Sequence, residues 1–139
     1  MKKFVKLSAV FMAVILSLCC MSCKSDDDDD DKETVLADKT VEIPASGYQY
    51  FDINLSKSAT VSLNVKVTKG SGVEIYAIDK SDYEDLKAGK DFEYYKDFSS
   101  DVATKEFSVT ATATAGHAYF VLVNRDSSAQ NVYTKIVVK

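Results

Sequence analysis

The single histidine of this chain, His117, is the first residue whose side chain could serve in catalysis. A serine–histidine–aspartate site could use it, because serines and aspartates are plentiful. Hydrolases of one large class place the serine in a Gly-x-Ser-x-Gly turn, and the sequence contains no such turn. Because His117 follows Gly116 at the start of an expected strand, we interpret it as a turn residue. A structural zinc site usually needs four cysteine or histidine ligands, and the folded part of the chain supplies one.

The acidic residues offer two further kinds of chemistry. Four acids fall within residues 79–85, and they could bind calcium if they faced Asp91 or Glu93. Their spacing does not match an EF-hand loop, and acids at the start of a helix are favoured by the helix dipole. Paired carboxylates in a cleft could hydrolyse a glycosidic bond, but a small sandwich seldom forms a deep cleft. We therefore expect no metal, no cofactor and no enzymatic activity.

The tyrosines are the best candidates for ligand binding. The chain has eight tyrosines and no tryptophan. The candidate residues are two on outward strand positions, Tyr48 and Tyr50, and three in or beside the irregular insertion 80–98, Tyr83, Tyr94 and Tyr95. Exposed aromatic rings suit sugar rings or protein partners, because they combine apolar area with a polar tip. The alternative is that tyrosine is simply a good strand former.

The elements that position the candidate side chains are predicted to be mainly β-strands. Apolar and polar residues alternate from Val35 onward, which is the pattern of a strand with one buried face. Residues 59–68 alternate without a break, and a slip of one residue would expose their whole apolar face. Residues 48–55, 107–113 and 132–138 repeat the pattern, and the alanines at 111 and 113 predict a thin part of the core.

Other segments predict how the strands are arranged. Residues 118–123 are apolar on both faces, which indicates a central strand covered on both sides. Residues 40–43 form a short strand that Pro44 ends, as is typical of a sheet edge. One helix is expected over residues 81–87, with a capping box of Ser81 and Glu84 and a stop at Gly89.

Turn residues favour antiparallel connections. Residues 70–72 and 115–116 separate strand pairs at hairpin distance, and residues 125–128 form a polar turn between the last two strands. About eight strands with regular turns predict an all-β fold: a single antiparallel β-sandwich, jelly-roll or immunoglobulin-like, with one short helix. We expect this domain to span residues 39–139.

The first 22 residues have the parts of a secretory signal. Lys2, Lys3 and Lys6 form a basic segment, and residues 10–16 form the core of an apolar one. This apolar stretch is shorter than the roughly 20 residues that span a membrane as a helix. The sequence therefore predicts an exported protein.

The end of this leader, Cys20-Met21-Ser22-Cys23, resembles the lipobox of bacterial lipoproteins. The resemblance implies that Cys23 is the lipidated N-terminal residue, with a membrane as its partner. The match departs from the usual pattern at Cys20, where a leucine is typical. All three cysteines lie within residues 19–23, so the expected sandwich contains no disulfide.

Six consecutive aspartates, residues 26–31, follow Cys23 closely. Like charges repel and keep a segment extended, so we expect residues 23–38 to be a disordered acidic tether. Lys24, Ser25, Asp26, Asp27 and Asp28 resemble the export signal of Bacteroidota-type surface lipoproteins. That resemblance implies display on the outer face of the outer membrane, and retention on its periplasmic side is the alternative.

The net charge excludes some partners. Loss of the leader's three lysines changes the formal charge from −4 to −7, and the chain has no basic run. Nucleic acid is therefore not expected as a partner, nor is direct electrostatic binding to anionic lipid.

The order of strands completes the interpretation. A glycine–aromatic segment, residues 47–53, leads to an alternating strand, then to residues 73–76, 119–124 and a valine-rich last strand. This order is similar to bacterial pre-peptidase C-terminal domains and, more loosely, to the Golgi-dynamics (GOLD) sandwich. The resemblance implies a non-catalytic accessory fold. We therefore expect a lipid-anchored surface module that binds an extracellular glycan or protein; the alternative is a structural or accessory subunit of an envelope complex.

Overall fold

A computed structural model describes residues 2–5 and 33–139 of the chain. Its elements, in chain order, are β1 (Lys2–Val5), β2 (Thr34–Ile43), β3 (Tyr48–Leu55), β4 (Ala59–Lys69), β5 (Val73–Asp79), α1 (Lys80–Lys87), β6 (Phe92–Tyr95), the 3₁₀ turn η1 (Lys96–Phe98), β7 (Ser100–Thr104), β8 (Glu106–Ala113), β9 (Gly116–Val123) and β10 (Gln130–Val138). Most of the expected leader, Cys23 and the export signal at 24–28 lie outside the described residues.

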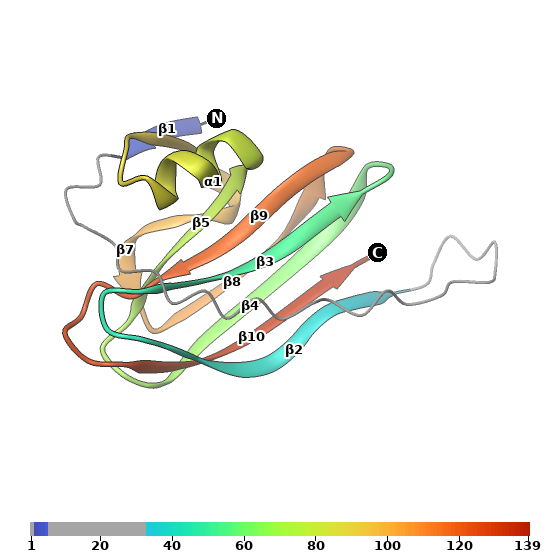
Figure 1. Ribbon diagram of the computed structural model, residues 1–139. Coiled ribbons are helices and arrows are strands. Elements are labelled where there is room, and N and C mark those ends of the chain that lie inside the picture. The colour runs from blue at the N-terminus through green and yellow to red at the C-terminus, as the bar shows by residue number, and fades with distance from the viewer. Residues whose placement is uncertain (1, 6–32) are drawn as a thin grey trace.

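Two antiparallel four-stranded sheets form the body of the fold (Figure 1). Their strand orders are β2-β10-β4-β8 and β3-β9-β5-β7, while β1 pairs with β6 in a separate ribbon. The expected antiparallel β-sandwich with one short helix is confirmed. Along the chain, consecutive strands of the two sheets alternate between them, except that β5 and β7 lie in the same sheet. These crossings are typical of the jelly-roll form of the sandwich.

The same crossings overturn the expected hairpins. Gly70 and Gly72 lie between β4 and β5, and residues 114–115 lie between β8 and β9. In both cases the second strand belongs to the opposite sheet, so neither turn closes a hairpin. Both connections are still short, because the two sheets of a sandwich pack only about 10 Å apart.

One apolar core fills the space between the sheets. Alternate residues of β4, among them Val61, Leu63 and Val65, face Phe120 and Leu122 of β9 across it. Burial of each such side chain stabilises the fold by about 1.5–3 kcal/mol. The end of β9 is buried on both faces, so its predicted central position is confirmed.

The first strand of the sandwich begins earlier than the sequence indicated. β2 starts at Thr34, with Ala37 buried in the core, so residues 34–38 belong to the sandwich and not to the expected tether. Beside the strand, Glu33 accepts a hydrogen bond from the Lys139 ammonium at 2.9 Å. The predicted edge position is confirmed, since β2 pairs with β10 alone, from Thr34↔Val138 to Ile43↔Gln130.

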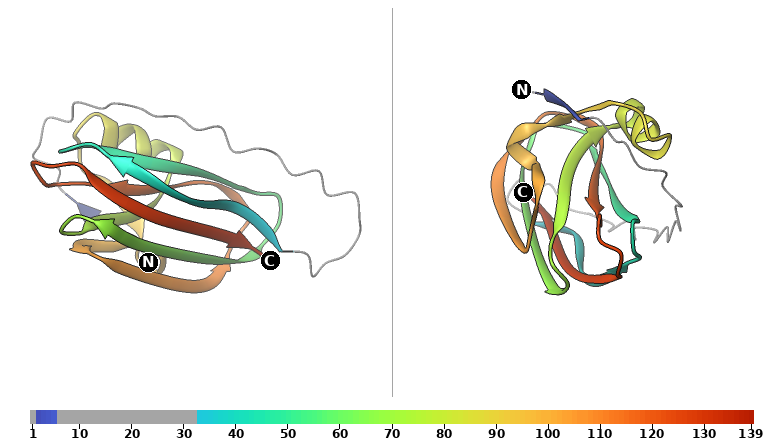
Figure 2. Two further views of the ribbon diagram at one scale, coloured as in Figure 1. Left: turned by 90° about the horizontal axis from the view of Figure 1, so that it is seen from below. Right: turned by 90° about the vertical axis from the view of Figure 1, so that its left-hand side faces the viewer.

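Part of the outer face of the sheet β3-β9-β5-β7 is covered by α1 and β6 (Figure 2). A second cluster of buried side chains lies beneath them, and it is mostly aromatic. Its members are Tyr48, Tyr76, Ile78, Tyr83, Leu86, Phe92, Tyr94, Val121 and Val123. The insertion at 80–98 therefore contains the predicted helix and, in addition, a strand and a 3₁₀ turn, and these elements pack on the sandwich.

Only the C-terminal end of α1 matches the prediction. Asp79 is the N-cap, and no side chain caps the helix, so the expected capping box of Ser81 and Glu84 is wrong. Gly89 has φ 69° and ends the helix as predicted, with its amide bonded to the Leu86 carbonyl. Among the described residues, no helix is long and apolar enough to cross a membrane.

One end of the sandwich is closed by a buried polar network. The Gln130 side chain accepts a hydrogen bond from the Gly72 amide and donates one to the Gly72 carbonyl, both at 2.9 Å. It also donates to Asn124 Oδ1 at 2.6 Å, and the Asn124 amide donates to the carbonyls of Ile43, Pro44 and Ser128. This network joins three connections between the sheets.

Candidate functional site

A group of aromatic and polar side chains lies on the outer face of β3 and β9, beside α1. In the register of the two strands, Asp52 lies opposite Tyr119, and Asn54 lies opposite His117. Paired residues in an antiparallel sheet face the same side, so Tyr50, Asp52, His117 and Tyr119 share one surface. We call these four residues together with Tyr83 of α1 the tyrosine patch.

Three rings form the centre of the tyrosine patch. Tyr83 stacks on Tyr119 with centroids 4.4 Å apart and planes at 25°. Tyr50 lies 5.1 Å from Tyr83 and meets Tyr119 edge-on at 5.8 Å. Such ring pairs contribute about 0.5–1.5 kcal/mol each beyond the area they bury. Mutual packing therefore holds the half-buried rings of Tyr50 and Tyr119 in place.

Polar groups border these rings. His117 Nε2 and Asp52 Oδ1 form a hydrogen bond of 2.6 Å on the exposed side, and the imidazole lies 5.0 Å from the Tyr119 ring. The Lys87 ammonium lies 4.8 Å above the Tyr83 ring and pairs with Glu84 at 2.8 Å. The patch thus presents ring faces, a carboxylate and an imidazole, with the Lys87 cation at its border.

His117 is therefore more than a turn residue, because it is the second residue of β9 and pairs with a carboxylate on β3. In the described part of the chain, its polar side-chain partner is Asp52, and no serine hydroxyl bonds to it. The pair therefore lies on the exposed part of the sheet face.

The five tyrosines proposed from the sequence have different environments. Tyr50 is half-buried in the tyrosine patch, and Tyr95 is half-buried elsewhere. Tyr48, Tyr83 and Tyr94 are buried, so the expectation that they are exposed is wrong. The outward side of β3 is not a solvent face at Tyr48, because α1 packs over it.

Burial also changes the acidity of these phenols. It raises the pKa of Tyr83 well above its ordinary value, with Tyr48 adding to the effect. Burial and a hydrogen bond donated to Asp101 at 2.9 Å raise the pKa of Tyr94 to about 12. Such groups stay protonated in the folded protein throughout the physiological range.

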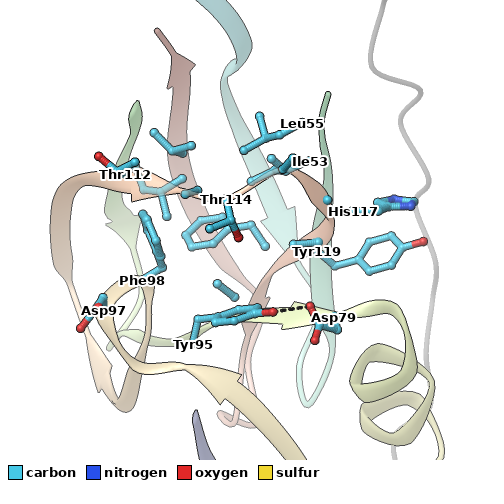
Figure 3. A pocket seen from close by; sticks show the side chains of 18 of the residues that line it. Ile53, Leu55, Asp79, Tyr95, Asp97, Phe98, Thr112, Thr114, His117 and Tyr119 are labelled. Atoms are coloured by element: carbon cyan, nitrogen blue, oxygen red, sulfur yellow. Dashed lines mark hydrogen bonds between the residues drawn. The ribbon is translucent and has the colours of Figure 1, made fainter. Parts of the chain in front are cut away.

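Tyr95 lines a cavity of about 340 Å³ between the two sheets (Figure 3). Its hydroxyl donates a hydrogen bond of 2.6 Å to Asp79 at the cavity wall. The cavity lies where β3 ends and β4 begins, with Leu55 and Val61 among its lining residues. This is the opposite end of the sandwich from the Gln130 network.

The acids of residues 79–85 do not converge on one point. Asp79 accepts the Tyr95 hydroxyl, Asp82 accepts the Glu93 amide at 2.9 Å, and Glu84 pairs with Lys87. Asp85 lies 4.0 Å from Lys90. Within residues 2–5 and 33–139, no group of three or more histidine, cysteine or acidic side chains could hold a metal ion.

The sequence did not identify Asp52, His117 or Tyr119 as part of one site. Alternation predicts that Asp52 points outward, and the sequence places Gly116 and His117 at the start of the later strand. What was missing was the register between β3 and β9, which joins residues about 65 positions apart.

Comparison with solved structures finds chains that are similar to this one. No protein-family model matches the sequence, and no curated protein matches it. The solved pre-peptidase C-terminal domain of collagenase from Bacillus anthracis is similar in structure, with a TM-score of 0.44 and 13% sequence identity. The match covers 73% of this chain and 89% of that chain.

Proposed function

We propose that this chain is a lipid-anchored, surface-displayed binding module without catalytic activity, and that the tyrosine patch binds an extracellular glycan or protein. The observation that carries the proposal is the arrangement of Tyr50 and Tyr119, two half-buried rings beside the exposed His117–Asp52 pair.

The chemistry of the patch fits such ligands. The apolar face of a sugar ring or a side chain of a protein partner can lie against the rings of Tyr50 and Tyr119. The Asp52 carboxylate accepts hydrogen bonds from hydroxyl or amide groups, and the His117 imidazole has a second nitrogen for a further bond.

The rigidity of the patch also favours binding. Tyr83 is buried behind the half-buried rings of Tyr50 and Tyr119 and stacks directly on Tyr119. Because this packing already fixes the rings, little side-chain entropy is lost when a ligand binds, which would otherwise cost about 0.5–1.5 kcal/mol for each immobilised side chain.

The proposed location rests on the first 33 residues. The lipobox-like ending would make Cys23 the acyl acceptor, and Lys24 to Asp28 would direct the protein to the cell surface. From Cys23 to Glu33, an extended acidic tether would reach roughly 33 Å at about 3.3 Å per residue. That distance would carry the domain away from the lipid headgroups.

Binding is tested by profiling the purified protein and its variants on glycan and protein arrays. We expect the double variant Tyr50→Ala and Tyr119→Ala to lose the ligand that the unmodified protein binds. Tyr133→Ala is the matched control, because Tyr133 is a half-buried tyrosine on the opposite sheet whose hydroxyl bonds to Asp38. An unchanged profile in the double variant would rule out the patch as the binding site.

Anchoring and display are tested separately on cells. Incorporation of a labelled fatty acid should be lost in Cys23→Ala and retained in Cys20→Ala. Protease added to intact cells should remove the domain. Resistance until the outer membrane is permeabilised would place the protein on the periplasmic side and overturn the surface assignment.

A further inference from the structure

The cavity between the sheets has a clear origin in the sequence. Ala77 of β5, Ala113 of β8 and Ala118 of β9 all line it. Elsewhere in the core, the same strands contribute larger residues such as Ile75, Val109 and Leu122. Three small side chains at one end of the sandwich therefore leave a space that the sheets do not fill.

The walls of this space are mainly apolar. Ile53, Leu55, Val61, Leu63 and Phe120 line it from the two sheets. Phe98 of η1 and the ring of Tyr95 border it on the side of the insertion (Figure 3). The polar groups of the wall include the hydrogen-bonded Tyr95 and Asp79, Thr112 and Thr114 on the side of β8, and Lys96 and Asp97 of η1.

The wall formed by the insertion is fixed in position. The Ser99 hydroxyl accepts a hydrogen bond from the Ala77 amide at 2.9 Å and donates one to the Tyr95 carbonyl at 2.6 Å. One serine thus attaches the segment that carries Tyr95 and Phe98 to β5. The cavity is therefore preformed, as ligand sites for small molecules usually are.

The cavity is distinct from the tyrosine patch although β9 contributes to both. Ala118 and Phe120 face inward, and His117 and Tyr119, which alternate with them, border the cavity while their rings point away from it (Figure 3). Alternation along one strand therefore separates two surfaces that lie back to back.

We propose that this cavity is a second binding site, and that its ligand is a small alcohol with a compact aromatic or branched aliphatic body. The volume of about 340 Å³ is near the lower end of the usual range of about 300–1,000 Å³ for ligand pockets. Apolar walls select the body of the ligand, and its hydroxyl joins the hydrogen bond between Tyr95 and Asp79.

The test uses benzyl alcohol as the probe and the methyl resonances of alanine in the purified full chain as the readout. Benzyl alcohol should shift the Ala77 and Ala118 methyl signals in a saturable way, toluene should bind more weakly, and methyl glucoside should have no effect. The absence of saturable shifts with benzyl alcohol would overturn the proposal.

Variants identify the site. Ala113→Leu adds volume at the cavity wall and should weaken benzyl alcohol binding by about tenfold or more. Ala111→Leu is the matched control, because Ala111 is the preceding inward residue of β8 and does not line the cavity. Ala118→Val gives a second filling variant if Ala113→Leu disturbs the fold. Equal binding in all folded variants would show that the alcohol sits elsewhere.

Two further variants test the polar contact and the independence of the sites. Tyr95→Phe should weaken the binding of benzyl alcohol and leave that of toluene unchanged; equal losses for both would contradict the role of the hydroxyl. The double variant Tyr50→Ala and Tyr119→Ala should leave benzyl alcohol binding intact. Loss of that binding would mean that the cavity is not a separate site.

Discussion

The rings of Tyr83 and Tyr119 stack face to face although the first belongs to α1 and the second to the central strand β9. Tyr83 is 5% exposed, whereas Tyr119 is only half-buried. The stack therefore has an inner ring that attaches the helix to the sheet and an outer ring that solvent can reach.

The two tyrosines should consequently respond differently to truncation. Tyr83→Ala should lower the free energy of unfolding by about 3 kcal/mol, because it removes a buried ring. Tyr119→Ala should cost about 1 kcal/mol and act mainly on binding. Urea denaturation of both variants measures these changes, and equal losses of stability would contradict the division of roles.

The hydrogen bonds between Gln130 and Gly72 give a second prediction. Gln130→Ala leaves the amide and carbonyl of buried Gly72 without their side-chain partner. Because each unsatisfied buried group costs about 1–3 kcal/mol, we expect a loss of about 3 kcal/mol in unfolding free energy by urea denaturation. Asn131→Ala, on the same strand but half-buried, is the control and should cost less.

Gly70 is coupled to the same glutamine. A Cβ atom at position 70 would lie 2.4 Å from Gln130 Oε1, and Gly70 has φ 137°. Gly70→Ala should therefore destabilise the protein through both the clash and the backbone. In the Gln130→Ala background the clash is gone, so the same substitution should cost less, by roughly 1 kcal/mol. A double-mutant cycle measures this difference, and strict additivity would argue against the contact.

The buried tyrosines predict loss of stability at alkaline pH. The pKa of Tyr94 is raised to about 12, and burial raises that of Tyr76 further above its ordinary value. An unfolded chain ionises its tyrosines near pH 10, so it loses protons before the folded chain does. The unfolding free energy should be unaffected by these groups below about pH 10 and fall above it.

Phenolate absorbance and urea midpoints between about pH 9 and about pH 12 check this prediction. Exposed tyrosines should titrate first, and the buried ones should ionise together with unfolding. Tyr94→Phe should reduce the dependence of stability on pH. Titration of all eight tyrosines in the folded protein near pH 10 would contradict the burial of the aromatic cluster.

Alternation in the sequence predicted most strands and their inner faces, but not their partners. The predictions for residues 59–68 and for the central strand at 118–123 are correct, since the pattern of apolar residues indicates which side chains are buried. Alternation does not indicate which sheet a strand joins, because strands of both sheets bury their apolar faces in the same core. For that reason the sequence predicts a hairpin at Gly70 to Gly72, whereas the segment connects a strand of one sheet to a strand of the other.

The candidate site was predictable only in part for a related reason. Tyr48 and Tyr50 were both placed outward, yet α1 covers the first and leaves the second half-buried. Only two side chains of the helix, Tyr83 and Leu86, are buried, which is a weak signal for a packed helix. The small residues Ala111 and Ala113 did predict a thin core, and Ala113 now lines the cavity.

The position of β2 determines how the fold would bear a pulling force. Under the proposed anchoring, drag on the domain would load the chain at Glu33, where a pull along the chain would follow the axis of β2. This strand is paired with β10 from Thr34 to Ile43, so the load acts in shear on all its backbone hydrogen bonds at once. Peeling them apart one by one would require a pull across the strand. The proposed tether would thus load a strand whose hydrogen bonds share the force, which suits a domain exposed to fluid flow.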